Sequence, residues 1–516
     1  MTDTSSLVKD VDYPGGFYRE QAPVYLKYIC ALNGLNSPSL EAPFTYCELG
    51  CGLGDTLAIL AGCYPKGRFY GIDLNASQIS QATALASASE STNASFIAAD
   101  IAELDPDSLP DFDFITLHGL YSWVPVPIQA AIREFIGKKL KPGGIAYISY
   151  NTMPGWGSAA PLRRYFIDQI QNMEGDILQR SKQIVDQLVR LRDLGAPFFR
   201  ENPSASAIVS RLQTADPRYV AHEYLGPSWQ PRYFSDVYKE MTALGLYFVG
   251  EGGIVENLLE HSIKPEFLDL LRKQSNRCEL EGLRDFIQNR FFRRDIYQKT
   301  VPGDTAATPD ELMQQTLFGL VATPVQIPDS IHLTDAPGLH FQGAWFDRIK
   351  QLLAYKVLTL EEILADPILS TCTDEDLIEA VKLLTVGGFC APFLTRERVP
   401  PRAPCETIKV VPKLNQVRLA AYDWISPSFT LASPVTGCGL SLNSLEAALL
   451  NALQRPDPIP WLWTELSQRG INLRTSDEKT TVEGEQKSLQ ALQQALDQFL
   501  QHKLPKLAYL GVVEPA

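Results

Sequence analysis

Apolar and polar positions alternate along the first third of the chain in a way that predicts strands and helices in turn. Short apolar runs predict strands at 44–49, 68–74, 95–100, 112–119 and 145–151. Apolar residues at helical spacing predict helices at 18–32, 55–63, 76–90 and 126–140. A KPGG turn at 141–144 leads into the fifth strand. Strands that alternate with helices predict right-handed βαβ units and a parallel sheet.

A different pattern begins after the fifth strand. Residues 157–220 have mostly helical spacing and are too many for a loop, so we expect a helical insertion there. The alternation resumes with a helix at 234–244 and a strand at 245–252. We expect residues 255–300 to be helical, and the segment 301–312, rich in Pro, Asp and Thr, to be a linker.

These patterns predict an α/β protein built of several parts, which agrees with a length of 516 residues at roughly 100–200 residues per domain. The predicted parts are an N-terminal helical segment at 1–43, a ligand-binding core at 44–156, a helical cap with the end of the sheet at 157–300, and a C-terminal α+β domain at 313–516. The last part alternates short amphipathic helices with short strands.

Charge and cysteine usage narrow the kind of partner. The formal net charge is −14, whereas a large nucleic-acid footprint normally needs a basic face. This balance argues against DNA or RNA and suits a small-molecule or protein substrate. Nine scattered cysteines without a CxxC pair argue against a metal site and indicate reduced thiols. No leader pattern and no apolar run of about 18–20 residues is visible, so we expect a cytoplasmic protein without a membrane span. The oligomeric state stays open, with a homo-oligomer among the alternatives.

The segment TYCELGCGLGDT carries most of the candidate chemistry. Gly50, Gly52 and Gly54 follow a strand and open a helix, where glycines let the backbone approach a ligand and leave NH groups free for it. A dinucleotide fingerprint needs a third glycine where this chain has Asp55, whose carboxylate would repel a pyrophosphate. The pattern GxGxG, preceded by Glu48, suits instead a ligand with a cationic amino-acid tail.

Two further strand ends place acids at the same edge of the predicted sheet. Asp73 ends the second strand, where a carboxylate can accept both hydroxyls of a ribose. Asp100 ends the third strand and can accept the exocyclic amine of an adenine, while Ile101 packs on the ring. Because open α/β sheets bind ligands at the carboxyl ends of their strands, these acids predict an adenosyl ligand that carries a sulfonium cation. The predicted cofactor-binding residues are Tyr18, Glu48, Gly50, Cys51, Gly52, Gly54, Asp73, Leu74, Asp100, Ile101 and His118.

Four motifs in order, CELGCGLG, GIDLNASQI, AADI and LKPGGIAYIS, resemble those of class I S-adenosylmethionine-dependent methyltransferases. The resemblance implies a Rossmann-like sheet and S-adenosyl-L-methionine as cofactor. Further phrases, DYPGGFYREQAP, HGLYSWVP, SYNTMPGW, HEYL, GLYFVGEG and RDFIQNRFFR, resemble bacterial methyltransferases with a methyltransferase regulatory domain. Relatives of that group include the rickettsial protein-lysine methyltransferases that modify outer-membrane proteins. This resemblance implies winged-helix character for the C-terminal domain and a protein substrate, with an outer-membrane or surface protein among the candidates.

The acceptor side of the site offers several candidates. Methyl transfer from a sulfonium is an in-line displacement, for which an enzyme supplies alignment and a dry site. A lysine acceptor, with an ordinary pKa of about 10.4, needs a desolvated slot or a base to lose its proton. We therefore consider His118, Tyr121, Tyr150 and Asn151 as catalytic residues at the mouth. His118 is either a base or pocket wall, or a strand-end histidine bonded to backbone. Tyr121, with Trp123, forms either an aromatic wall for a cationic amine or the packing of a lid.

Two other groups have two readings each. His222 and Glu223 either contact substrate or, as we favour, cap a helix or tie two elements together. Arg290, Arg293 and Arg294 either meet an acidic partner or, as we favour, lie on a solvated helix face beside local acids.

The leading function is methyl transfer from S-adenosylmethionine to a protein lysine amine by in-line displacement. One alternative is a small-molecule methyltransferase, since the core motifs concern the donor and not the acceptor. Another is a non-catalytic regulatory or scaffold protein that senses S-adenosylmethionine. The segment SYNTMPGW differs from the (D/N)PP(Y/F) box of nucleic-acid amino-methylating enzymes, which argues against adenine methylation.

Overall fold

The computed structural model describes residues 15–226, 228–300, 308–333, 336–354, 356–370, 372–396, 408–422, 424, 428–473 and 484–515. The first fourteen residues of the predicted N-terminal segment, and residues 301–307 of the predicted linker, lie outside these ranges. The helix α14 (Pro309–Gln314) begins inside the segment predicted to be a linker, because Thr308 and Glu311 form a capping box there.

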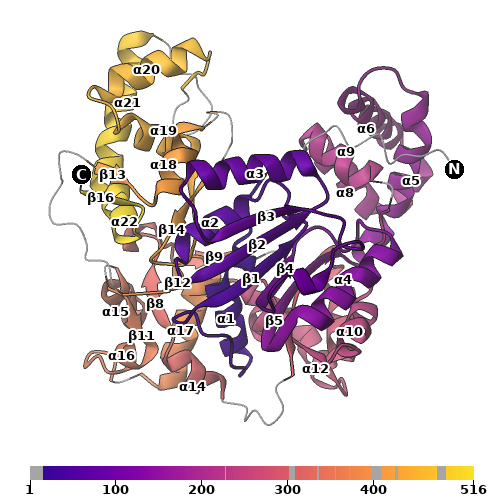
Figure 1. Ribbon diagram of the computed structural model, residues 1–516, viewed down its shortest axis with the longest axis horizontal. Helices are drawn as coiled ribbons and strands as arrows, with labels where there is room; N and C mark the ends of the chain where they lie inside the picture. The colour runs from indigo at the N-terminus through magenta and orange to yellow at the C-terminus, as the bar shows by residue number, and fades with distance from the viewer. Residues whose placement is uncertain are drawn as a thin grey trace.

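A seven-stranded sheet forms the centre of the molecule, with the order β3-β2-β1-β4-β5-β7-β6 (Figure 1). Its strands are β1 (Phe44–Leu49), β2 (Gly67–Asp73), β3 (Ala94–Ala98), β4 (Phe112–Leu117), β5 (Leu140–Asn151), β6 (Leu246–Glu251) and β7 (Phe292–Lys299). The α/β class and the Rossmann-like strand–helix alternation are confirmed. The sheet is mixed rather than parallel, because β7 runs antiparallel to both β5 and β6. The expected KPGG turn belongs to β5, which pairs irregularly with β4 there.

Helices cover both faces of this sheet. They are α1 (Pro23–Leu32), α2 (Asp55–Cys63), α3 (Ala76–Ala88), α4 (Val126–Lys139) and α10 (Phe234–Thr242). One core lies between the sheet and α4 and α10, where Ile115, Ile132 and Val237 are fully buried. The second core includes residues of α1 and α2 and continues into the C-terminal half of the chain. The sheet is therefore held from both sides, and its strand ends are fixed in space.

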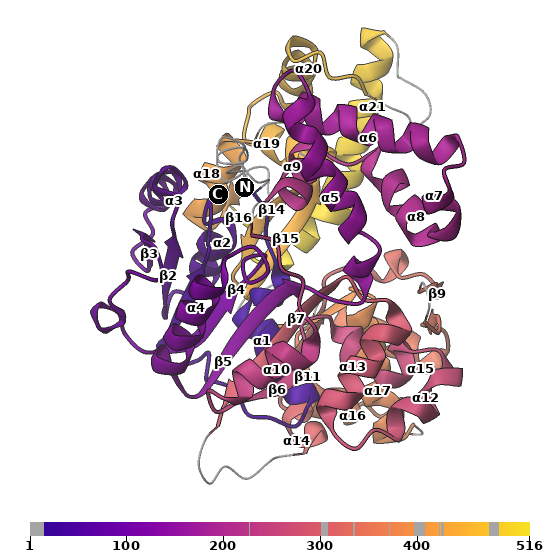
Figure 2. The same ribbon diagram turned by 90° about the vertical axis from the view of Figure 1, so that its right-hand side faces the viewer.

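Five helices after β5 form a cap with a hydrophobic core of its own. They are α5 (Ala160–Gln169), α6 (Ile177–Asp193), α7 (Pro197–Glu201), α8 (Pro203–Leu212) and α9 (Pro217–Leu225). Phe166, Ile184 and Val209 lie fully buried in this core. The cap leaves and rejoins the sheet at neighbouring points, since Thr152 pairs with Arg232. The predicted helical insertion is confirmed, and Figure 2 shows the cap as a separate group of helices.

The expectation that residues 255–300 are helical is wrong at the end of this range. The helices α11 (Leu259–Ser262), α12 (Pro265–Arg272) and α13 (Arg277–Gln288) form, but the chain then turns at Asn289, whose φ is +46°, and continues as β7. The strand was not predicted because its sequence contains several charged residues, which a pattern of apolar positions does not assign to a buried strand. Arg293 and Asp295 are both fully buried within it, because they pair with each other at 2.9 Å.

The prediction that the arginines of this region lie on a solvated helix face is wrong. Arg293 also contacts Glu281 at 3.0 Å and Asp285 at 2.6 Å, and all three side chains are at most 3% exposed. Arg290, 8% exposed, contacts Glu256 at 2.5 Å. Buried charges persist only when they are paired and hydrogen-bonded. The ion pairs therefore form part of the core that joins β7 to α13.

The C-terminal half consists of short helices and small sheets. Its further helices are α15 (Ala344–Leu353), α16 (Leu360–Leu364), α17 (Asp374–Val386), α18 (Lys413–Ala420), α19 (Ser444–Ala452), α20 (Pro458–Gln468), α21 (Glu485–Gln498) and α22 (Leu504–Tyr509). Its strands are β8 (Leu317–Leu320), β9 (Ser330–Ile331), β10 (Leu339–His340), β11 (Leu358–Thr359), β12 (Cys390–Pro392), β13 (Ile408–Val410), β14 (Ser428–Ser433), β15 (Cys438–Asn443) and β16 (Val513–Pro515). The predicted α+β content is present, and the winged-helix assignment stays a prediction.

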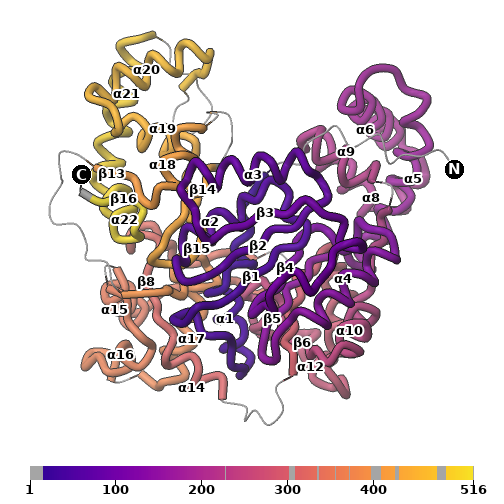
Figure 3. The backbone as a smooth tube through the Cα atoms, viewed as in Figure 1, coloured from indigo at the N-terminus to yellow at the C-terminus, as the bar shows by residue number. Residues whose placement is uncertain are grey.

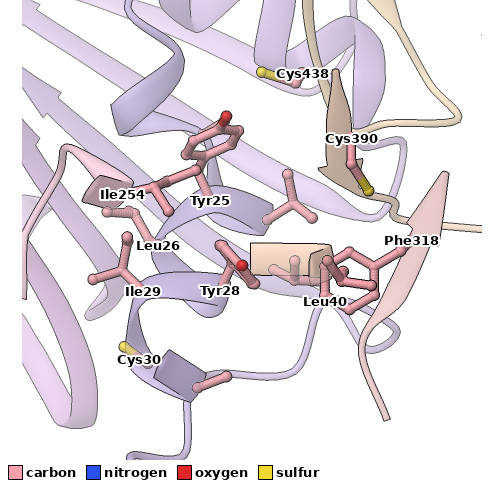
Figure 4. Packing of buried hydrophobic residues seen from close by; sticks show 14 of the residues in the cluster. Tyr25, Leu26, Tyr28, Ile29, Cys30, Leu40, Ile254, Phe318, Cys390 and Cys438 are labelled. Carbon is pink, nitrogen blue, oxygen red and sulfur yellow. The ribbon is translucent and has the colours of Figure 1, made fainter. Parts of the chain in front are cut away.

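This half packs directly on the N-terminal part of the chain. Tyr28 of α1 contacts Phe318 of β8 edge to face, with ring centroids 5.8 Å apart, and Cys390 of β12 belongs to the same cluster (Figure 4). Further along, the Tyr64 hydroxyl donates a hydrogen bond to the Gly437 carbonyl oxygen at 2.8 Å. In Figure 3, α18 and β14 lie beside α2 and α3. Within the described ranges, no helix is long and apolar enough to cross a membrane.

A cavity at the carboxyl ends of the strands

A cavity of about 490 Å³ opens at the carboxyl ends of β1, β2, β4 and β5. This is the edge at which the sequence predicts the cofactor. Eight predicted site residues line the cavity together, namely Tyr18, Glu48, Gly50, Cys51, Gly52, Asp73, His118 and Asn151. They come from the N-terminal segment, the glycine loop and four strand ends, so the fold brings residues that are distant in sequence to one cavity.

The glycine loop has the conformation that its residue types imply. Gly50, Gly52 and Gly54 have φ values of +73°, +53° and +70°, a region that side chains rarely adopt. A Cβ on Gly52 would meet only the Gln78 side chain, at 3.7 Å, so this face of the loop is open to the cavity. A Cβ on Gly54 would lie 2.5 Å from Phe96. Gly54 therefore serves the packing of α2 rather than the cavity wall.

Asp73 holds the loop in place at the end of β2. Its Oδ2 accepts a hydrogen bond from the Gly52 backbone NH at 2.8 Å, and its Oδ1 accepts one from the Asn75 NH at 2.8 Å. Both carboxylate oxygens keep further lone pairs, since each oxygen can accept more than one hydrogen bond. The carboxylate is thus oriented in advance beside the cavity.

Glu48 is a buried carboxylate that faces the cavity. It is 4% exposed, and its Oε2 has no hydrogen-bond partner among the described residues. Burial raises the pKa of Glu48 to about 8, and the charges of Asp73 and Asp55 add to this rise, although Gln21 opposes it. An unpaired buried carboxylate is costly unless a cation joins it. The position therefore fits the cationic tail of the predicted ligand.

His118 forms part of an aromatic stack on the cavity wall. Its ring lies 3.8 Å from that of Tyr18, with an interplanar angle of 23°, and its Nδ1 is 2.9 Å from the Tyr147 hydroxyl. Burial, with a smaller effect of Arg294, lowers the pKa of His118 to about 3. A histidine of such low pKa is a poor acceptor of a lysine proton. The arrangement supports the reading of His118 as a pocket wall.

Two of the catalytic candidates lie outside the cavity. The Tyr150 hydroxyl donates to the Asp295 carboxylate at 2.5 Å. Tyr150 faces away from the side of the sheet to which Asn151 points, because neighbouring residues of a strand point to opposite faces. The Tyr121 hydroxyl donates to Glu240 at 2.8 Å and accepts from Arg133. Both tyrosines are at most 1% exposed, so neither can reach an acceptor in this structure.

Besides Gly54, three predicted cofactor residues lie outside the cavity lining. Leu74 is 71% exposed. Asp100 accepts a hydrogen bond from the Ala102 NH at 2.9 Å and so closes a local turn, with Ile101 inside it. Their roles towards an adenine stay predictions.

The structure adds cavity residues that the sequence did not assign to the site. His222, Glu223 and Gly226 reach it from the end of α9, and Phe292 reaches it from β7. The structure places His222 and Glu223 on the cavity wall, and the structural role favoured for this pair stays a prediction. Trp123, considered as an aromatic wall, also lines the cavity. Phe292 was missed because its segment was predicted to be helical, whereas it begins β7. The residues of α9 were missed because no pattern in the sequence shows that this helix lies near the glycine loop.

Comparison with known proteins agrees with this geometry. The model of a methyltransferase domain family matches residues 40–183, and that of a predicted methyltransferase regulatory domain matches residues 216–299. An uncharacterized protein of Synechocystis sp. is 32% identical over 526 residues, which cover 99% of this chain and 100% of that protein. An uncharacterized protein of Rickettsia prowazekii is 37% identical over 231 residues, 44% of this chain and 89% of that protein.

Among solved structures, PKMT2 from Rickettsia typhi in complex with AdoHcy matches with a TM-score of 0.73 and 21% identity. The match covers 97% of this chain and 99% of that one, so the two proteins share their fold along nearly their whole length. The sheet, the glycine loop and the acidic strand ends define a class I methyltransferase. The chain belongs to the bacterial S-adenosylmethionine-dependent methyltransferases that carry a methyltransferase regulatory domain.

Proposed function

We propose that this methyltransferase transfers the methyl group of S-adenosylmethionine to a lysine side chain of a protein. One observation carries the proposal, namely the charge of the cavity wall. Glu48, Asp55, Asp73 and Glu223 line the cavity, and none of the described residues that line it is a lysine or an arginine. Such a wall favours a cationic donor and an acceptor that arrives as a cation, and it disfavours an anionic acceptor.

The donor end supports placement of the ribose and of the methionine tail of the cofactor on named residues. The oriented Asp73 carboxylate would accept the ribose hydroxyls, and Glu48 would pair with the methionine amino group. Gly50 and Gly52 leave the loop backbone free of side chains at the cavity. The bound sulfonium supplies the activated methyl group, and the protein supplies alignment and exclusion of water.

A protein acceptor is favoured over a metabolite by the architecture beside the cavity. The fold that PKMT2 shares extends beyond the central sheet over the cap and the C-terminal half, two further parts of the chain that flank the sheet. In Figure 1, the cap helices and the helices α20 and α21 lie on opposite sides of α3. A small-molecule acceptor would require no such flanking parts. An outer-membrane or surface protein that passes through the cytoplasm remains the acceptor class that the family resemblance suggests.

Transfer of a labelled methyl group into a cell lysate tests the proposal. Purified enzyme and donor labelled in the methyl group are added, and the products are separated by size. We expect label in the protein fraction and, after tryptic digestion, a mass increase on lysine. Label found only in the small-molecule fraction would overturn the lysine assignment and favour the small-molecule alternative. An absence of any transfer would favour the sensor alternative.

A further inference from the structure

Three side chains from different parts of the chain meet at the cap end of the cavity. Trp123 comes from the loop before α4, Asn151 from the last position of β5, and Glu223 from α9 of the cap. They share the cavity with Asp73 and Glu48 of the donor end. None of the three is needed to explain donor binding.

Asn151 presents an unused hydrogen-bond donor. Its backbone NH donates to Ser122 Oγ at 2.9 Å, and its carbonyl oxygen accepts from the Arg232 NH at 2.9 Å. The residue is therefore fixed, and it is 4% exposed. Its Nδ2 has no hydrogen-bond partner at bonding geometry within the described residues. The amide lies close enough to the Glu223 carboxylate to oppose the rise of its pKa, so it orients that carboxylate and can also donate to a polar group that enters the cavity.

Trp123 lines the same cavity as this amide. A Cβ on Gly226 would lie 3.0 Å from the Trp123 ring, so the indole packs directly on the backbone where α9 ends. The Trp123 backbone NH donates to the Leu120 carbonyl oxygen at 2.8 Å, which fixes the loop that carries this residue. An indole face is the aromatic surface that attracts ammonium groups best.

Glu223 has no basic partner within ion-pair distance among the described residues. The positive charge of Arg163 on α5 lowers the pKa of Glu223. That guanidinium is, however, engaged elsewhere, because it donates to the Gly226 carbonyl oxygen and stacks on Trp229 at 4.7 Å. The charge of Glu223 raises the pKa values of three tyrosines, namely Tyr18, Tyr219 and Tyr224. The Asn151 side chain lies beside the Glu223 carboxylate. The carboxylate is thus available to a cation that enters the cavity.

We infer that Glu223 is the base that takes a proton from the ammonium group of the acceptor, with Trp123 and Asn151 forming the slot that holds it. This inference deepens the proposed function and rests on it, because it requires an amine acceptor. The ammonium transfers one proton to the Glu223 carboxylate and becomes a neutral amine. The nitrogen lone pair then forms the N–C bond as the C–S bond breaks, and that bonding pair stays on sulfur as the thioether. The proton on Glu223 leaves to water after product release.

The acidity of the neighbouring groups agrees with this assignment. Burial raises the pKa of Glu223 to about 7, while Asn151 and Arg163 oppose part of that rise. A base whose pKa lies near the working pH combines an ionised form with useful proton affinity. His118, with a pKa of about 3, lacks that affinity. Glu48 is already placed at the donor tail.

Sinefungin offers a test that does not require the natural acceptor. In this analogue of S-adenosylmethionine, a carbon that bears an amine replaces the methylsulfonium, so a cationic amine sits at the position of transfer. S-adenosylhomocysteine has the same tail and nucleoside without that amine. The ratio of the two affinities, measured by titration calorimetry, therefore isolates contacts to the transferring position.

We expect Glu223→Gln to weaken sinefungin at least tenfold at pH 7.5 while the affinity for S-adenosylhomocysteine stays unchanged, and Glu223→Asp to restore part of the loss. Glu48→Gln is the matched control, because it should weaken both ligands by the same factor. An unchanged ratio in Glu223→Gln, or equal loss of both ligands, would overturn the assignment. This outcome is separate from the lysate test, in which label found only on non-amine products would refute the amine acceptor itself.

Discussion

The Arg418 guanidinium donates a hydrogen bond to the Asp55 carboxylate at 2.5 Å, and this contact joins the C-terminal half to the donor cavity. Arg418 lies on α18, whereas Asp55 is the first residue of α2 and lines the cavity. The same carboxylate lies against Gly15, where a Cβ would have no room. The helix whose N-terminus forms the cofactor loop is therefore held by a residue 363 positions later in the chain.

Breaking this pair should cost stability. The side chains of Arg418 and Asp55 are only 15% and 21% exposed, so their attraction is screened less than that of a surface pair. We expect a double-mutant cycle of Arg418→Gln and Asp55→Asn to give a coupling of about 1 kcal/mol in urea unfolding. Lys409→Gln is the control, since its pair with Glu514 is 58% and 44% exposed and should contribute little. If Arg418→Gln and Lys409→Gln lowered the free energy of unfolding by the same amount, Arg418 would have no special role.

Asp73→Ala should remove most of the affinity for S-adenosylmethionine. The variant loses hydrogen bonds from two ribose hydroxyls to a charged acceptor, each worth about 1.5–3 kcal/mol. It also frees the Gly52 NH that Asp73 now orients. Titration calorimetry should show a loss of about a hundredfold or more. Asp107→Ala serves as control, because that carboxylate is 71% exposed and lies outside the cavity. Wild-type affinity in folded Asp73→Ala would exclude the proposed ribose contact.

The local patterns of the sequence predict β1 to β6 well, because each strand there is an apolar run between polar turns. They fail at β7, where Arg293 and Asp295 neutralise each other inside the core. An ion pair of this kind is invisible to a hydrophobic pattern, since pattern analysis treats every charge as solvated. The glycine loop, Glu48 and Asp73 could be predicted to share one edge of the sheet because each lies at the end of a strand that is recognisable in the sequence.

The acceptor half could not be predicted in the same way. Glu223 lines the cavity although α9 follows the cap insertion, far along the chain from the glycine loop. The stack of Tyr18 on His118 at 3.8 Å likewise joins residues 100 positions apart, although each of the two was predicted at the site. Tyr150 shows the opposite case. The alternation of the strand turns it away from Asn151 and into a contact with Asp295, so adjacency in sequence misled the assignment.

Removal of the cap should separate donor binding from transfer. Residues 152 and 232 pair with each other, so a short linker that replaces residues 158–229 can close the gap without moving β5. Asp73, Glu48 and the glycine loop lie outside this segment, whereas Glu223 and Gly226 lie inside it. We expect calorimetry to show retained binding of S-adenosylhomocysteine, with label transfer into the lysate abolished. A shortened protein that folds but binds no S-adenosylhomocysteine would show that the cap is part of the donor site.

Glu48 should make the empty enzyme less stable at neutral pH than a variant without the charge. Burial raises its pKa to about 8, whereas an exposed glutamate in the unfolded chain titrates near 4.3. Between these two values the unfolded chain gives up its proton and the folded chain keeps it, so the free energy of unfolding falls as the pH rises and levels off above about 8. Glu48→Gln removes this loss. We therefore expect the variant to melt at a higher temperature than the wild type at pH 8 and at about the same temperature at pH 4.

The same carboxylate should make donor binding depend on pH in the opposite sense. A cation in the cavity stabilises the ionised form of Glu48, so binding below pH 8 releases its proton. The affinity of the wild type for S-adenosylhomocysteine should rise between pH 6 and pH 8, because the cost of removing that proton falls. Calorimetry in two buffers of different ionisation enthalpy measures the proton release directly. Glu48→Gln should bind more weakly, with a smaller pH dependence and less proton release. A variant with unchanged proton release would show that Glu48 only orients the glycine loop, because a carboxylate that pairs with the amino group of the ligand must ionise when the ligand binds.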